Sequence, residues 1–205
     1  INELGMGSES EQGSKFERPW KASAYQFSHL RKIESLEEDR VVLNVPLPQG
    51  IIEQHGGGEM IKVEIPDETG TSMGVENLRL ISNYDANARS MLRSRTGGLY
   101  EADEEENMRV GIRVSCLNGW VRNCTILHPA RKAIAVQDAV YVTIREVNSL
   151  DPISVIRGGR RYSFSNSDSS MVLFYRCHSE YGRHDYACGS RDMGPIAFVL
   201  STVFK

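Results

Sequence analysis

The sequence predicts an all-β fold, a right-handed parallel β-helix in which successive coils of chain stack into a solenoid. Three observations favour this fold. A six-residue pattern recurs along the chain, short β-branched segments alternate with turn residues, and no helical period competes between residues 108 and 150. About 22 residues is a suitable length for one coil, because each strand must return to lie beside the strand one coil earlier.

The recurring pattern is an apolar residue, two polar or aromatic residues, and then an apolar residue or a cysteine. One copy, VRNCTI, occupies residues 121–126. The pattern returns 23 residues later at 144–149, and it stands 46 residues earlier, twice that interval, at 75–80. A fourth copy at 174–179 lies 30 residues beyond the copy at 144–149. These intervals indicate equivalent places in stacked coils.

A second pattern runs beside the first. Residues 111–114 are matched 22 residues later by residues 133–136. We therefore expect inward columns in which Ile112 lies over Ile134 and Cys124 lies next to Val147. A β-sandwich is the alternative, since it also gives short strands at regular spacing, but it does not explain one pattern returning at 23 and 46 residues.

The N-terminal part of the chain is less regular. Residues 1–35 are predicted to form an N-terminal arm or cap, and residues 36–205 the β-helix domain. We expect a short helix over 24–38 and short strands at 41–45 and 60–65, each bounded by Gly or Pro turns.

An insertion is predicted at about residues 85–108. It holds the acidic run 103–106, which we expect to be a solvated loop, with calcium binding as the alternative. An apolar run at 196–204 closes the sequence. An open strand edge there predicts a piece of a longer solenoid, or an assembly partner that covers the C-terminal edge.

Composition excludes several classes of function. The net charge of −3 argues against a general nucleic-acid binder, which carries a basic excess. No stretch approaches the roughly 18 apolar residues of a membrane span. The four cysteines lack C-x-x-C spacing, which argues against a zinc site.

Four blocks carry a family resemblance: GWVRN at 119–123, LDP at 150–152, GGRRYSF at 158–164, and GRHDY at 182–186 followed by Gly194-Pro195. From about residue 36 onward the sequence resembles the pectate-lyase-like superfamily of right-handed parallel β-helices. The Gly-Arg-His-Asp block resembles an uncharacterised group within it. The resemblance implies an acidic polysaccharide as partner, and we expect an extracellular or secreted protein.

The sequence departs from two chemistries of that superfamily. It does not carry the hydrolase combination of Asn-x-Asp, Asp-Asp, Gly-His-Gly and Arg-x-Lys motifs, so two-carboxylate glycoside hydrolysis has no motif support. Its acidic run at 103–106 does not match the clustered aspartates of calcium-dependent pectate lyases. No cofactor is therefore predicted, with calcium as the alternative.

The block Arg183-His184-Asp185 is the strongest catalytic candidate. Elimination from a uronate needs a base for the proton next to the carboxylate and a cation to neutralise that carboxylate. His184 suits the first role and Arg183 the second. On an extended strand Arg183 and Asp185 face one way and His184 the other, whereas a tight turn would bring all three together. The alternative is a structural turn in which Arg183 pairs with Asp185.

An arginine-rich loop is the second candidate. Arginine binds carboxylate or sulfate in a bidentate manner, and Tyr162 would stack on a sugar ring or donate a proton. We expect loops 151–162 and 183–192 to line one groove. The predicted substrate-binding residues are Arg157, Arg160, Arg161, Asp185 and Arg191, with His184, Arg183 and Tyr162 as the catalytic set. The alternative is a surface loop whose arginines pair with nearby acids.

Together these features predict a carbohydrate-active protein that binds an acidic polysaccharide, with β-elimination as the chemistry its side chains would support. The alternative is a non-catalytic extracellular module with a structural or adhesive role, because no complete catalytic set of the superfamily is present.

Overall fold

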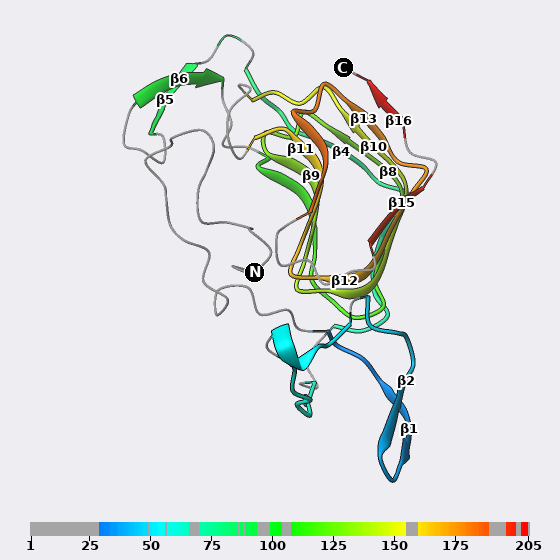
Figure 1. Cartoon of the computed structure of the whole chain (residues 1–205). Helices are drawn as coiled ribbons and strands as arrows, with labels where there is room; N and C mark the ends of the chain where they lie inside the picture. Colours follow the sequence, from blue (N-terminus) through cyan, green and yellow to red (C-terminus); the bar gives the residue numbers. More distant parts are fainter. Residues whose placement is uncertain are drawn as a thin grey trace. The chain divides into compact units, whose positions relative to one another are not determined.

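Figure 1 shows the computed structural model of the chain. It describes residues 29–48, 50–55, 57–65, 70–85, 87, 89–93, 99–103, 108–154, 160–188, 196–199 and 202–204. Contacts divide the chain into two compact units, residues 1–65 and residues 66–205. The described elements are β-strands apart from one 3-10 turn, η2 (Glu53–His55), which confirms the all-β class. Within these residues no helix has the length and apolar character needed to cross a membrane.

The first unit contains a β-hairpin. Strand β1 (Ile33–Glu37) pairs antiparallel with β2 (Arg40–Leu43). The helix expected over 24–38 is therefore wrong for its described part, because pairing with the β-branched residues of β2 overrides local helix propensity. The strand expected at 60–65 is also wrong. This segment is exposed, and no strand within the described residues pairs with it.

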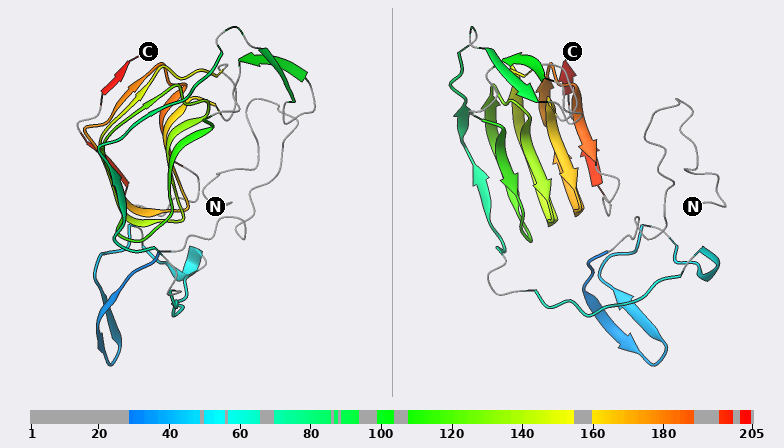
Figure 2. Two further views of the ribbon diagram at one scale, coloured as in Figure 1. Left: turned by 180° about the vertical axis from the view of Figure 1, so that it is seen from behind. Right: turned by 90° about the vertical axis from the view of Figure 1, so that its left-hand side faces the viewer.

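The second unit is built on two parallel sheets and one separate antiparallel hairpin. The larger sheet holds β3 (Gly74–Glu76), β4 (Arg79–Ile81), β8 (Trp120–Leu127), β10 (Val140–Leu150), β12 (Ser170–Tyr175), β13 (His178–Glu180), β15 (Ile196–Val199) and β16 (Thr202–Phe204). The smaller sheet holds β7 (Val110–Val114), β9 (Lys132–Gln137), β11 (Tyr162–Ser167) and β14 (His184–Cys188). The chain visits the two sheets alternately, so each strand lies beside one from the preceding pass, as Figure 2 shows.

The registers confirm the predicted columns. Ile112 lies beside Ile134, and Cys124 lies beside Val147. The six-residue pattern also stacks in register, since Val121 pairs with Ile144. Recurrence in the sequence therefore corresponds to adjacency between parallel strands.

The 46-residue interval has a different meaning from twice 23. Val75 pairs directly with Val121, so β3 and β8 are neighbours and 46 residues separate adjacent passes of the chain. The extra length is the insertion, which contains the antiparallel hairpin of β5 (Arg89–Arg93) and β6 (Leu99–Asp103). The two strands of a hairpin pair with each other. The insertion therefore lengthens the chain between β3 and β8 without disturbing the pairing of these two strands.

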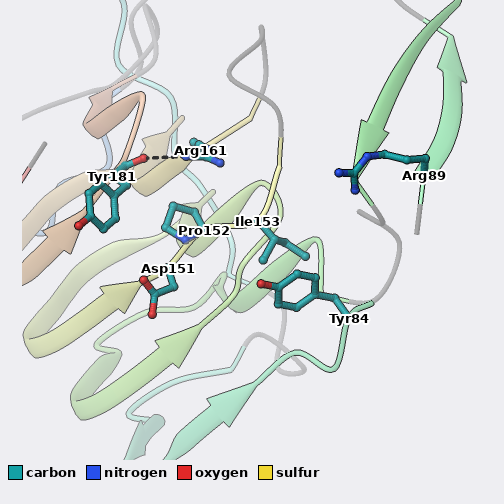
Figure 3. Close-up of a pocket in the computed structure, with 7 residues that line it drawn as sticks. All are labelled: Tyr84, Arg89, Asp151, Pro152, Ile153, Arg161 and Tyr181. Carbon is teal, nitrogen blue, oxygen red and sulfur yellow. Dashed lines mark hydrogen bonds between the residues drawn. The ribbon is translucent and has the colours of Figure 1, made fainter. Parts of the chain in front are cut away.

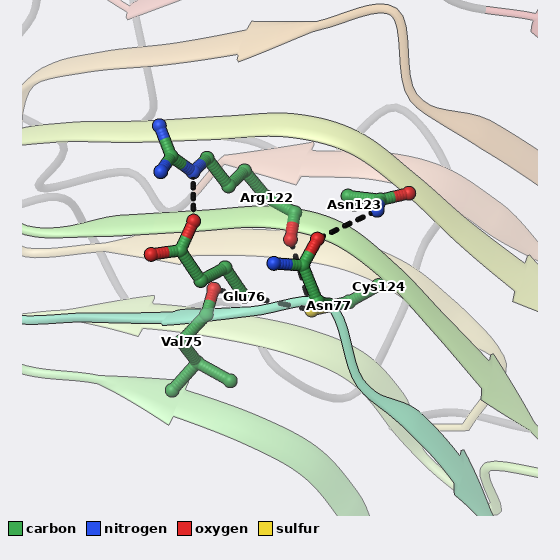
Figure 4. Close-up of polar contacts among 6 residues, drawn as sticks. All are labelled: Val75, Glu76, Asn77, Arg122, Asn123 and Cys124. Carbon is green, nitrogen blue, oxygen red and sulfur yellow. Dashed lines mark hydrogen bonds and ion pairs between the residues drawn. The ribbon is translucent and has the colours of Figure 1, made fainter.

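Residues in the left-handed region turn the chain at equivalent places in successive passes. One column has φ between 50° and 59° and consists of Asn77, Asn123, Glu146 and Arg176. It separates β3 from β4 and bends the long strands β8 and β10, because one residue of opposite twist redirects a strand. The Asn123 side chain donates to Asn77 Oδ1 at 2.7 Å, and Arg122 pairs with Glu76 beside it (Figure 4).

The core lies between the two parallel sheets. Its largest fully buried side chains are Phe164, Phe174, Ile126, Ile134 and Ile144. The ring of Phe164 stacks on that of Tyr186 with centroids 5.1 Å apart. The buried thiol of Cys177 behaves as a small hydrophobic group, and desolvation raises its pKa to about 11.

Candidate functional site

A pocket of about 340 Å³ opens at the corner where the chain passes from the larger sheet to the smaller one (Figure 3). Four parts of the chain build it: the segment after β4, the start of β5, the loop after β10, and the loop after β13. It is lined by Tyr84, Arg89, Asp151, Pro152, Ile153, Arg161 and Tyr181. Two tyrosines, two arginines and a carboxylate therefore share one hollow.

Arg161 is fixed in the pocket wall by backbone carbonyls. Its Nε donates to the carbonyl of Ser154 at 2.5 Å, and its Nη1 donates to the carbonyl of Tyr181 at 3.5 Å (Figure 3). The residue has φ of 53°, as a tight bend before β11 requires. These two bonds hold the guanidinium group in a fixed orientation in the pocket wall.

The opposite wall is held by an aromatic contact. The ring of Tyr84 lies 5.0 Å from that of His128, at 57°. Nδ1 of His128 lies 3.1 Å from the backbone oxygen of Asp151, which is a corner residue with φ of 46°. His128 thus connects two passes of the chain and supports the tyrosine that faces the pocket.

Beside the pocket, Tyr162 and His184 begin neighbouring strands and pair in register. Their rings are 4.7 Å apart and inclined at 39°. The carbonyl of Arg161 accepts the backbone N–H groups of Arg183, at 2.8 Å, and of His184, at 3.1 Å. The structure therefore brings four predicted residues, Arg161, Tyr162, Arg183 and His184, to one edge of the smaller sheet.

Lys132 pairs with Tyr162 on the other side and extends this row. Burial lowers the pKa of its ammonium group, and the nearby Arg113 lowers it further. Sequence reasoning missed Lys132. The signal was available, because Lys132 directly precedes the repeat 133–136 and Tyr162 occupies the same place one pass later.

Asp185 points away from its neighbours in the Arg-His-Asp block. Its side chain is buried with 9% exposed, whereas Arg183 and His184 are exposed. The hydroxyl of Ser179 lies 2.8 Å from Asp185 Oδ1 and 2.5 Å from Ser163 Oγ. One hydroxyl proton serves only one acceptor, so we assign a chain in which Ser163 donates to Ser179 and Ser179 donates to the carboxylate. The carboxylate of Asp185, predicted to bind substrate, therefore lies in the interior and is bonded to Ser179.

Other predicted residues lie elsewhere. Arg157 and Arg191 fall outside the described residues, as do residues 104–107 of the acidic insertion. Arg160 is half-buried and does not line the pocket. Among the described residues no group of three or more His, Cys, Asp or Glu side chains could hold a metal ion.

Sequence reasoning also missed Tyr84, Arg89 and Tyr181 in the pocket, and it placed Asp151 in a groove-lining loop without naming it as a site residue. Asp151 and Tyr181 stand 30 residues apart, the same interval that separates the paired residues of β10 and β13. That interval could have placed both at one corner.

Comparison with known proteins gives no further guide to this site. No protein-family model, no curated protein and no solved structure matches the chain.

Proposed function

We propose that residues 66–205 form a segment of a right-handed parallel β-helix that binds an acidic polysaccharide at the corner pocket. The observation that carries the proposal is Arg161, held by two carbonyls in a pocket that it shares with Tyr181. A guanidinium group in fixed orientation suits a carboxylate, and an exposed tyrosine ring offers an apolar face with a polar edge to a sugar.

The strand order supports the solenoid part of the proposal. Parallel neighbours joined through a strand of another sheet need a crossover, and such crossovers are right-handed in nearly all proteins. Loops from successive coils then lie side by side along one corner, as Asp151 and Tyr181 do in the pocket.

Cleavage by β-elimination is the second candidate function, and the contact between Tyr162 and His184 favours it. In this reaction His184 would take the proton next to the uronate carboxylate while the bond to the leaving oxygen breaks. Tyr162 would give its proton to that oxygen, and Arg183 would neutralise the carboxylate as charge develops. The new double bond conjugates with the carboxylate, so the product absorbs ultraviolet light.

Binding is tested with Arg161→Gln against polygalacturonate, alginate and hyaluronate, each measured by calorimetry. We expect the wild-type protein to bind at least one polymer and the variant to bind it about tenfold more weakly, the cost of losing a charge-assisted contact. Arg79→Gln, an exposed arginine on β4, is the matched control. Failure of the wild-type protein to bind any polymer, or equal affinity of Arg161→Gln, would contradict the proposal.

Cleavage is tested separately by ultraviolet absorbance on the polymers that bind. We expect product formation that His184→Ala and Tyr162→Phe each reduce by about 100-fold or more. Binding without any absorbance change would instead assign the chain to the non-catalytic alternative.

A further inference from the structure

Two cations lie close together on the smaller sheet. Arg113 is an exposed residue of β7, and Lys132 is the half-buried first residue of β9. The two strands are neighbours, with Arg113 opposite Ala135, which comes three residues after Lys132. Both side chains are long enough to span this offset, and the charge of Arg113 acts on the ammonium group of Lys132. We name Arg113 and Lys132 the cation pair.

The cation pair has no carboxylate partner among the described residues. Nη1 of Arg113 donates to Oε1 of Gln137 at 2.6 Å, and this amide oxygen carries no net charge. The ammonium group of Lys132 makes no hydrogen bond or ion pair within that part of the chain. Burial and Arg113 both lower its pKa, whereas a nearby carboxylate would raise it. The fold therefore holds two like charges together, one of them partly removed from water.

Charged side chains on the larger sheet are arranged differently. Arg122 of β8 pairs with Glu76 of β3. Arg176, which follows β12, lies 3.7 Å from the carboxylate of Glu146 in β10. In both cases a cation from one pass of the chain meets a carboxylate from another. An anion from outside the chain would stabilise the cation pair in the same way.

The cation pair adjoins the residues proposed for elimination. Lys132 is opposite Tyr162 in the next strand, and Tyr162 is opposite His184. The strand order β14-β11-β9-β7 places Arg113 on the far side of β9 from Tyr162. At a strand spacing of about 4.8 Å, the backbone of the pair lies roughly 5–10 Å beyond Tyr162, in the direction away from His184. A sugar that reaches the cation pair is therefore a neighbour of the sugar at His184.

We propose that the cation pair binds the carboxylate of a second sugar of the polyuronate, next to the sugar that faces Tyr162 and His184. This inference rests on the proposed function and extends its binding site along the smaller sheet. The carboxylate accepts hydrogen bonds from Lys132 and Arg113 and neutralises both cations. The pair positions the polymer, so its loss lowers affinity.

The test measures dissociation constants of single variants of the full chain. Lys132→Met keeps the length of the side chain and removes its charge, whereas Lys132→Arg keeps the charge. Arg79→Gln, at an exposed arginine of β4, is the control for a change of net charge. The ligand is a uronate polymer from the panel above that the wild-type protein binds, and each Kd is measured at several salt concentrations.

We expect Lys132→Met to bind the polymer about tenfold more weakly, because a charge-assisted contact is lost. Release of one counterion fewer should make the salt dependence of log Kd shallower by about one. Lys132→Arg should stay within about threefold of the wild-type affinity, and Arg79→Gln should match the wild-type protein. Equal losses in Lys132→Met and Lys132→Arg would show that the charge does not bind the polymer, and would overturn the proposal.

Acetylation of lysine gives an independent measurement, because Lys132 is the only lysine between residues 63 and 204. The neutral amine is the form that reacts with acetic anhydride, and mass spectrometry of peptides follows each site. With polymer at ten times its Kd, acetylation of Lys132 should slow about tenfold. Lys62, which is exposed and lies 3.5 Å from Glu64 in the first unit, is the control and should react at an unchanged rate. An unchanged rate at Lys132 would contradict the proposal.

Thermal unfolding without ligand tests a structural role. An ammonium group that is partly desolvated beside another cation stabilises nothing, so the Tm of Lys132→Met should equal that of the wild-type protein or exceed it. A clear fall in Tm would show that Lys132 stabilises the fold, and would overturn its assignment to a ligand.

Two outcomes separate failure of the cation pair from failure of the proposed function. If Arg161→Gln weakens binding while Lys132→Met keeps the wild-type affinity and salt dependence, the cation pair is wrong and the pocket stands. If the wild-type protein binds no uronate polymer, the proposed function fails and the cation pair fails with it.

Discussion

At the scale of single residues, the corner before β14 requires a glycine. A Cβ on Gly182 would lie 2.3 Å from Asp185 Oδ1 and 2.9 Å from Ser163 Oγ. Because Asp185 is buried and held by Ser179, its carboxylate has little room to move. We expect Gly182→Ala to lower the free energy of unfolding by about 1–3 kcal/mol, measured by urea denaturation.

Gly70→Ala is the control for this prediction. A Cβ at Gly70 would meet Cε of Met73 at 2.4 Å, but that atom ends a flexible side chain and can move aside. Its cost should be well below that of Gly182→Ala. Equal losses would show that the packing around Asp185 is not rigid.

Cys177 makes stability depend on pH. Burial raises its pKa from 9.0 to about 11, so the folded protein holds the thiol proton more tightly than the unfolded chain does. This contribution is fully present below pH 9.0 and is lost as the pH rises toward 11. The loss is at most roughly 3 kcal/mol. Under reducing conditions, the unfolding free energy of Cys177→Ala should fall less over this window than that of the wild-type protein. Parallel curves would contradict the assignment.

At the scale of elements, the column of residues with positive φ (Asn77, Asn123, Glu146 and Arg176) determines how β8 and β10 bend. Asn123 has φ of 50° and bonds to Asn77. Alanine at position 123 would lose this bond and carry the strain of a Cβ in that conformation, whereas glycine would lose only the bond. We expect Asn123→Ala to be less stable than Asn123→Gly by about 1 kcal/mol, measured by chemical denaturation. The usual order, with alanine the more stable in a strand, would indicate that the bend does not need this conformation.

The same elements show what the sequence could predict. Ile112 and Ile134 stack as expected, because inward positions of parallel neighbours must match in size and polarity. The hairpin at β5 and β6 was not predicted, since antiparallel pairing within an insertion leaves no trace in a repeat between coils. The pocket was only partly predicted. Arg161 belongs to the GGRRYSF block at 158–164, which the sequence singles out. Tyr84 lies in no recognisable motif, and only the fold brings it to the pocket.

At the scale of the whole molecule, the described hydrophobic core lies in the second unit. All of its buried members fall between Ile112 and Cys177, and the residues packed against them include Val75 and Leu80. Contacts divide the chain after Ile65. Strands of both parallel sheets pair with neighbours from the same unit, so residues 66–205 hold the interactions that the two sheets need.

We therefore expect a chain of residues 66–205 to fold alone. It should give a β-sheet circular dichroism spectrum and unfold cooperatively, and it should bind any polymer that the full chain binds with similar affinity, because the pocket lies within it. The matched control is the same shortened chain carrying Phe164→Ala, which should lose about 3–5 kcal/mol by opening a cavity in the core. An unfolded shortened chain would show that the first unit stabilises the stack. A folded chain without affinity would place part of the binding site within residues 1–65.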